Sequence, residues 1–145
     1  MKKPFSMILL ASLLALGACG DDDDVKADAA PSGADAAPSV GCAADFAGCT
    51  EFTDETAVTT FDVTTGPGNV YTPKCIKVKV GTAVTIAASA VHPFASAGCN
   101  VTAIGTAGTA PITFTPTEAG TFGYYCSVHG GTAGTGMAGA IQVVP

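Results

Sequence analysis

From residue 41 onward, short runs of alternating apolar and polar residues follow one another, separated by glycine and proline. In residues 71–80 (YTPKCIKVKV), lysines alternate with Ile76, Val78 and Val80, and residues 83–86 repeat the alternation after a Gly-Thr turn. A period of two places one face of a strand on a core and the other in water. These runs therefore predict antiparallel-type strands with one buried face.

Further β-rich runs cover residues 112–114, 121–125 and 140–144, and Pro116 and Gly120 lie in the loop between the first two. No segment of this region keeps a helical period. About seven or eight short strands within residues 41–145 are typical of a β-sandwich. We predict an all-β domain over residues 42–145.

The N-terminus has a different pattern. Residues 1–18 contain two lysines and an apolar stretch too short to span a membrane, which is typical of a signal peptide. The sequence Leu16-Gly17-Ala18-Cys19 resembles the lipobox of bacterial lipoproteins, which implies lipidation of Cys19 after cleavage. The alternative is secretion with ordinary cleavage after small residues, and either outcome exports the protein.

Residues 19–41 are rich in Asp, Ala, Pro, Ser and Gly and contain no aromatic side chain. Such a segment cannot bury enough apolar surface to fold, so we predict a disordered tether. Half of the twelve acidic residues lie in it, and the chain has no arginine. This composition argues against a nucleic-acid partner. We expect a lipid-anchored protein on the periplasmic face or the cell surface, and favour the outer membrane.

The chemistry is concentrated in residues 124–137 (YYCSVHGGTAGTGM), which place Cys126, His129 and Met137 between two predicted strands. Thiolate and thioether suit Cu(I), imidazole suits both oxidation states, and two His with one Cys and a weak axial Met define blue-copper sites. The only other histidine of the chain is His92. The sequence thus predicts one copper ion held by these four residues. A structural or exposed role for each is the alternative.

The domain resembles the cupredoxins, in the broad plastocyanin and azurin family, over about residues 57–144. The early similarity is Tyr71-x-Pro73-x-x-Ile76-x-Val78 with the following turn and strand, and the later one runs from residue 114 into Cys126-x-x-His129. The resemblance implies a Greek-key β-sandwich. It also implies that two histidines and the cysteine are equatorial copper ligands: His92, His129 and Cys126. Met137 corresponds to the axial ligand.

Two features depart from the family pattern. Seven residues separate His129 from Met137, a longer loop than plastocyanins typically have, and four of them are glycine. Pro93 follows His92 where many family members have Asn, and proline has no N–H. If that position normally donates to the copper-bound sulfur, this thiolate keeps more electron density, and we predict a lower reduction potential than in a matched site.

The cysteine count agrees with a metal-bound Cys126. Of six cysteines, removing Cys19 for lipid and Cys126 for copper leaves four, which form two disulfides in an oxidising compartment. Sequence alone allows three pairings of these four. We favour Cys49–Cys75, which ties the entry segment to a strand, together with Cys42–Cys99.

Electron transfer is the leading functional hypothesis, because four protein ligands leave no open position for a substrate. We expect a non-enzymatic monomer that meets a redox partner such as a cytochrome or a copper oxidase. One alternative is a copper carrier or buffer in copper homeostasis, although the chain lacks methionine- or histidine-rich tracts. The other alternative is a copper-free structural sandwich. Colour, reversible reduction and metal stoichiometry distinguish the three.

Overall fold

A computed structural model describes residues 41–145. Within this range the backbone consists of strands and turns, with a single 3-10 turn η1 (Phe46–Gly48). The nine strands of this range are β1 (Thr53–Asp54), β2 (Thr60–Gly66), β3 (Val70–Thr72), β4 (Cys75–Lys79), β5 (Ala83–Ile86), β6 (Phe94–Ser96), β7 (Ile112–Phe114), β8 (Gly120–Gly130) and β9 (Gly136–Val144). The predicted all-β class is confirmed.

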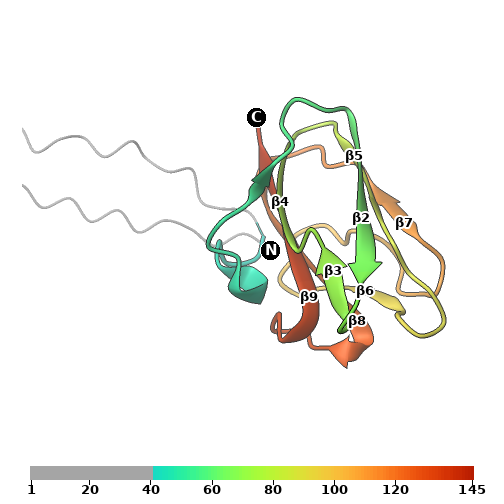
Figure 1. The fold of residues 1–145 in the computed structure, drawn as a ribbon. Helices are drawn as coiled ribbons and strands as arrows, with labels where there is room; N and C mark the ends of the chain where they lie inside the picture. The colour runs from blue at the N-terminus through green and yellow to red at the C-terminus, as the bar shows by residue number, and fades with distance from the viewer. Residues whose placement is uncertain (1–40) are drawn as a thin grey trace, which may run out of the picture. The chain divides into compact units, whose positions relative to one another are not determined.

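The strands form two sheets that face each other (Figure 1). One sheet has the order β1-β4-β9-β8-β6 and the other the order β3-β2-β5-β7. Both sheets are mixed. The expected antiparallel pairing is wrong for β4, which runs parallel to β1 and β9, and β2 runs parallel to β5, while the remaining pairs are antiparallel. The long β8–β9 pair lies in the middle of the larger sheet and carries Cys126, His129 and Met137.

The core lies between the sheets and follows the alternation seen in the sequence. In β4, Ile76 and Val78 are fully buried, while the intervening lysine is partly exposed. In β8, Phe122, Tyr124 and Cys126 belong to the same buried cluster. Successive residues of a strand point to opposite faces, so every second residue of β4 and of β8 reaches this core.

The segment 71–80 differs from the single strand that its alternation predicts. The structure divides it into β3, which belongs to the smaller sheet, and β4, which belongs to the larger sheet. Pro73 lies at the break, where its missing N–H prevents the ladder from continuing. Val80 lies just beyond β4 and is exposed, so the buried face ends at Val78.

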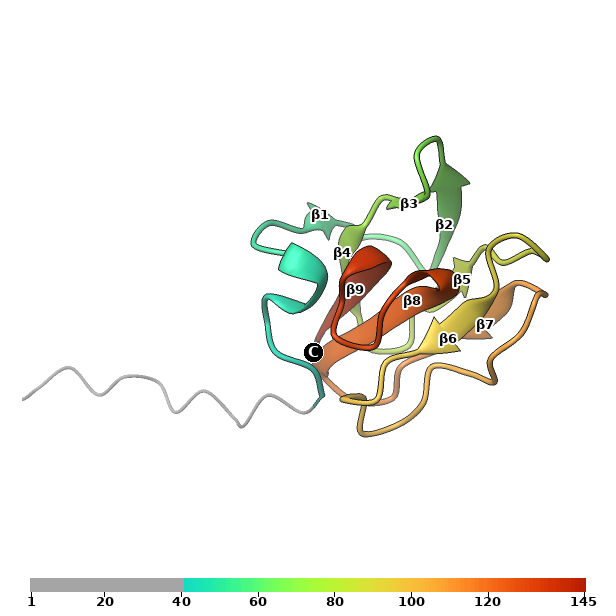
Figure 2. The ribbon, with the colours of Figure 1, turned by 90° about the horizontal axis from the view of Figure 1, so that it is seen from below.

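A second apolar cluster covers the outer face of the larger sheet. It consists of Cys42, Phe46, Ala47, Cys49, Ala97, Ala138 and Ala140, with Phe52, Cys75 and Tyr125 packed against it. The 3-10 turn η1 packs against β9 and β8, and Figure 2 shows it beside β9. The strand β9 is thus buried on both faces, which explains its nearly continuous apolar sequence.

The predicted signal peptide, Cys19 and the tether up to residue 40 lie outside the described residues. Gly41, the last residue assigned to the tether, forms an isolated bridge with Thr121 of β8. Between residues 41 and 145, no helix has the length and apolar character that crossing a membrane requires.

Candidate metal centre

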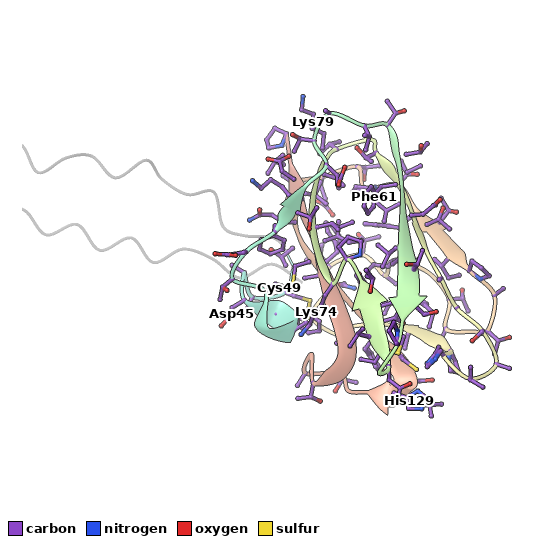
Figure 3. The ribbon with its side chains drawn as sticks, viewed as in Figure 1. Asp45, Cys49, Phe61, Lys74, Lys79 and His129 are labelled. Carbon is purple, nitrogen blue, oxygen red and sulfur yellow. A yellow bond between two sulfur atoms is a disulfide. The ribbon has the colours of Figure 1, made fainter. Side chains whose placement is uncertain are left out.

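The structure brings His92, Cys126 and His129 together at one end of the domain. Cys126 and His129 lie in the second half of β8, and His92 lies just before β6, the neighbour of β8. Figure 3 shows His129 at the end of the domain opposite to Lys79. One potential ligand atom from each of the three residues lies within 4.8 Å of the other two.

An irregularity in the β8–β9 pair orients these side chains. The register pairs Tyr125 with Ala138 and next pairs Gly130 with Gly136. Residues 126–129 of β8 therefore lie opposite a single residue of β9, Met137. Extra residues on one strand form a bulge that bends it and redirects its side chains. The bulge allows the cysteine and the histidine of one strand to point to the same place.

Cys126 is the most buried residue of the cluster. It is fully buried, and its thiol is the only free one among residues 41–145. The Cys126 sulfur lies 3.6 Å from Nδ1 of His129. The rings of His92 and His129 have centroids 5.0 Å apart and planes inclined by 53°. The three donor atoms are therefore close enough to share one metal ion.

His92 is held by a short turn of backbone hydrogen bonds. Its N–H donates to the carbonyl of Ser89 at 3.2 Å, and the Ser89 N–H donates back to the carbonyl of His92 at 3.1 Å. Nδ1 of His92 is buried and has no hydrogen-bond partner. Buried polar atoms are rarely left unpaired, and each exception requires an explanation. A bound cation at the centre of the cluster would supply the missing partner.

The residues present fit a copper ion. One thiol and two imidazoles are the donor types of blue-copper sites, and the orphan nitrogen of His92 points to a ligand. Cys126 is buried, and His92 and His129 are both partly accessible. A metal at this place would be shielded by the core while one imidazole edge remains near the solvent.

Met137, the axial ligand expected from the sequence, lies beside this cluster in the fold. It is 1% exposed and belongs to the same buried cluster as Cys126. It is also the β9 residue that lies opposite the bulge carrying Cys126 and His129. The seven-residue loop therefore does not remove Met137 from the end of the domain, because β9 starts at Gly136 and its first buried residue faces β8.

The backbone around Cys126 offers no N–H to its sulfur among residues 41–145. The N–H of Ser127 donates to the carbonyl of Pro93 at 2.9 Å, and the N–H of Phe94 donates to Gly108 at 2.7 Å. Pro93 itself has no N–H. In the β6–β8 pair around Cys126, residue 93 thus has no N–H, and the N–H groups of Phe94 and Ser127 already donate to carbonyl oxygens.

The sequence marked Tyr71 only as part of the family motif, and the structure shows it to be a core residue of β3. Its hydroxyl is buried without a partner, and its ring packs edge-on against Tyr124 with centroids 4.9 Å apart. Burial and, secondly, the negative charge of Cys126 raise the pKa of Tyr71 far above its ordinary value. The Tyr124 hydroxyl, in contrast, donates to the carbonyl of Lys74 at 3.5 Å. Only a three-dimensional contact reveals this difference, since both tyrosines look alike in the sequence.

Both disulfides that we favoured from the sequence are present. Cys42 is bonded to Cys99 and Cys49 to Cys75. The first joins the start of the domain to the loop after β6, and the second joins the segment after η1 to the start of β4. Cys126 lies on the other side of the sheet and takes part in neither.

No family model matches the chain, and no curated protein matches it. Solved structures do match. Native pseudoazurin from Hyphomicrobium denitrificans is 22% identical at a TM-score of 0.47, with 58% of this chain and 74% of that chain covered. A reduced amicyanin variant is 28% identical at a TM-score of 0.44, with 62% and 87% covered. A purple cupredoxin from Nitrosopumilus maritimus is 23% identical at a TM-score of 0.41, with 57% and 98% covered.

The described residues form an all-β sandwich, as the strand pattern of the sequence predicted, and it is built from two mixed sheets. Residues 41–145 also carry a His–Cys–His cluster at one end of the sandwich.

Proposed function

We propose that this protein carries single electrons with one copper ion held by His92, Cys126 and His129, with Met137 as the axial ligand. The observation that carries the proposal is the cluster of a buried free thiol and two imidazoles within 4.8 Å, with an unpartnered buried nitrogen on His92. Copper, when bound, supplies one-electron chemistry between Cu(I) and Cu(II). Four protein ligands leave no open position for a substrate, which favours transfer over catalysis.

The placement of the donors on strands and on a tight turn supports this role. Cys126 lies between two strands, opposite Phe94 of β6 on one side and beside Met137 of β9 on the other. His92 is fixed by its reciprocal bonds with Ser89. Ligands placed by strands move little, and a site on rigid elements exchanges electrons with little rearrangement.

The surface next to the site suits brief contact with a redox partner such as a cytochrome or a copper oxidase. Val91 and Val128, the neighbours of the two histidines, are 64% and 63% exposed. Residues 80–145 contain a single charged side chain, Glu118, which lies outside the ligand segments. We expect association driven by apolar contact and steered little by charge, so that its rate changes weakly with ionic strength.

We also propose that Cys19 carries a lipid that attaches the exported protein to the membrane, with the outer membrane favoured. The support is the Leu16-Gly17-Ala18-Cys19 sequence behind a basic and apolar start. Replacement Cys19→Ser should release the protein from the membrane fraction and abolish incorporation of labelled fatty acid. Labelling that persists in this variant would refute the proposal.

The test of electron transfer is to load the purified full chain with Cu(II) and record absorption and paramagnetic resonance spectra. We expect one copper per chain, an intense thiolate-to-copper band and reversible one-electron reduction. The variant Cys126→Ser should lose the band, while the exposed neighbour change Ser127→Ala should keep it. Copper that leaves readily to a weak chelator would indicate a carrier instead, and no stoichiometric copper would indicate a structural sandwich.

The role of Met137 needs a separate comparison. If Met137 is only a core residue, Met137→Leu should lower the free energy of unfolding by less than about 1.5 kcal/mol and leave the copper spectrum unchanged. If Met137 is the axial ligand, the same substitution should also shift the reduction potential and the resonance parameters. Ile141→Leu is the matched control, because Ile141 lies on the same strand and face and is equally buried. Identical spectra in the two variants would exclude Met137 as a ligand.

A further inference from the structure

The segment 42–49, here called the cystine segment, lies against the outer face of the two strands that carry the proposed ligands. It is fixed at its start by the Cys42–Cys99 disulfide and at its end by the Cys49–Cys75 disulfide. The N–H of Cys42 also donates to the carbonyl of Thr121 in β8 at 2.8 Å. The cystine segment is therefore attached to the sheet at both ends.

The Cys42–Cys99 disulfide is also attached to β8, through the residue that follows Cys99. Asn100, which follows Cys99, donates from its side chain to the carbonyl of Gly123 at 2.8 Å and accepts from the N–H of Gly123 at 2.7 Å. The same side chain donates to the Ser96 hydroxyl at 2.8 Å. These bonds give the cystine segment a rigid attachment point three residues before Cys126.

The middle of the cystine segment touches the glycine-rich residues 130–136, here called the ligand loop. A Cβ atom added to Gly134 would lie 2.6 Å from the backbone nitrogen of Ala47 and 3.3 Å from the ring of Phe46. The Phe46 ring also covers Gly123, where an added Cβ would meet it at 2.6 Å. Phe46 is thus packed at once on β8 and on the ligand loop.

The backbone at this contact adopts conformations that need support. Ala47 has a φ of 60°, which is uncommon for a residue with a side chain, and Gly134 has a φ of +81°. The ligand loop contains Gly130, Gly131, Gly134 and Gly136. Glycine loses more conformational freedom than any other residue when it is ordered, so this loop needs external packing to stay in one conformation.

We propose that the cystine segment positions the ligand loop, with Phe46 as the contact residue, and so fixes His129 and Met137 relative to Cys126. This inference rests on the proposed function only in treating His129 and Met137 as copper ligands. The two ligand-bearing ends of the loop belong to β8 and β9, and η1 packs against both strands. Loosening the loop would shift both ligands together while Cys126 stays in the core.

The alternative is that the cystine segment only stabilises the domain. Two variants separate the roles. Gly134→Ala places a Cβ against the Ala47 backbone and pushes the segment away, at a strained φ of +81°. Gly68→Ala introduces the same strain, at a φ of +82°, but its Cβ meets nothing within 4 Å. The difference between the two reports on the contact and not on the glycine conformation.

The first measurement uses the metal-free full chain and nuclear magnetic resonance relaxation of residues 130–136. We expect order parameters typical of rigid backbone in the unchanged protein and in Gly68→Ala. In Gly134→Ala and in Phe46→Ala we expect values below about 0.6 in the ligand loop, with the strands unchanged. Phe46→Leu, which keeps an apolar side chain, should restore most of the order.

The second measurement uses Cu(II). Phe46→Ala and Gly134→Ala should weaken copper binding on the order of 10–100-fold and alter the resonance parameters, as loss of outer-shell support does. A ligand loop that stays as ordered in Phe46→Ala as in the unchanged protein would overturn the inference. If the unchanged protein binds no copper, the proposed function fails, but the relaxation data on the metal-free chain still decide the role of the cystine segment.

Discussion

The two disulfides differ in the chain length that they close, and this difference predicts how much each stabilises the domain. Cys42–Cys99 spans 57 residues and Cys49–Cys75 spans 26. In the chain-entropy model a bridge stabilises by restricting the unfolded chain, and it does so more for longer loops. Taken alone, the two bridges are worth about 4.2 and about 3.5 kcal/mol at 25 °C.

The loops are nested, which lowers both values. When Cys49–Cys75 is intact, the outer loop has an effective length of 31 residues, that is 57 less 26. Removing the outer bridge from the native protein then costs about 3.7 kcal/mol, and removing the inner bridge costs about 3.0 kcal/mol. Loss of both costs about 7 kcal/mol, which is comparable to the whole stability of a small domain.

The variants should be alanine pairs, Cys42→Ala with Cys99→Ala and Cys49→Ala with Cys75→Ala, because Cys42 and Cys49 are buried and serine would bury a hydroxyl. Urea unfolding of the copper-free protein gives the free energy without the contribution of metal binding. We expect the outer pair to lose more stability than the inner pair. Losses below about 1 kcal/mol in both variants, at unchanged urea dependence, would refute the chain-entropy reasoning.

Three further changes test single groups. Pro93→Asn should raise the reduction potential on the order of 60 mV, because a new N–H donor to the sulfur would favour the reduced site by about 1.4 kcal/mol. Voltammetry that shows no rise would reject the argument that the Cys126 sulfur lacks a hydrogen-bond donor here. Tyr71→Phe should stabilise the metal-free protein by about 1 kcal/mol, because it removes a buried unpaired hydroxyl, as urea unfolding can check. Asp54 has a pKa lowered from 3.8, first by the Thr56 hydroxyl, so its stabilisation is present above that value and lost as pH falls through the folded pKa. Asp54→Asn should flatten the acid side of the stability profile, and a profile equal to that of the unchanged protein would contradict this.

The sequence correctly predicts strands that have one buried face and one more exposed face. Residues 83–86 form β5 as the alternation indicates, and Ile76 and Val78 of β4 are buried as expected. The three residues of the His–Cys–His cluster also come together as the spacing and the resemblance imply. The strands could be predicted because they depend on residue type and local spacing, whereas the meeting of His92 with Cys126 followed from the resemblance.

Other features depend on contacts between distant segments. Ala138 and Ala140 of β9 look like weak strand residues, yet they are small because the cystine segment lies on them. Nothing in residues 42–49 indicates which face of which strand they cover. The division of residues 71–80 between two sheets is likewise a tertiary choice, although Pro73 marks the place where it occurs.

The larger sheet also explains how one free thiol coexists with two disulfides within residues 41–145. Successive residues of a strand point to opposite faces, so Tyr125 joins the outer cluster and Cys126 joins the core. Cys42, Cys49 and Cys75 all belong to the outer cluster, on the far side of the sheet from Cys126. A disulfide needs close and mutually directed Cβ atoms, which the intervening sheet prevents. A slip of one residue in β8 would turn Cys126 toward these cysteines and remove it from His92, so the same register that protects the thiol also builds the proposed copper site.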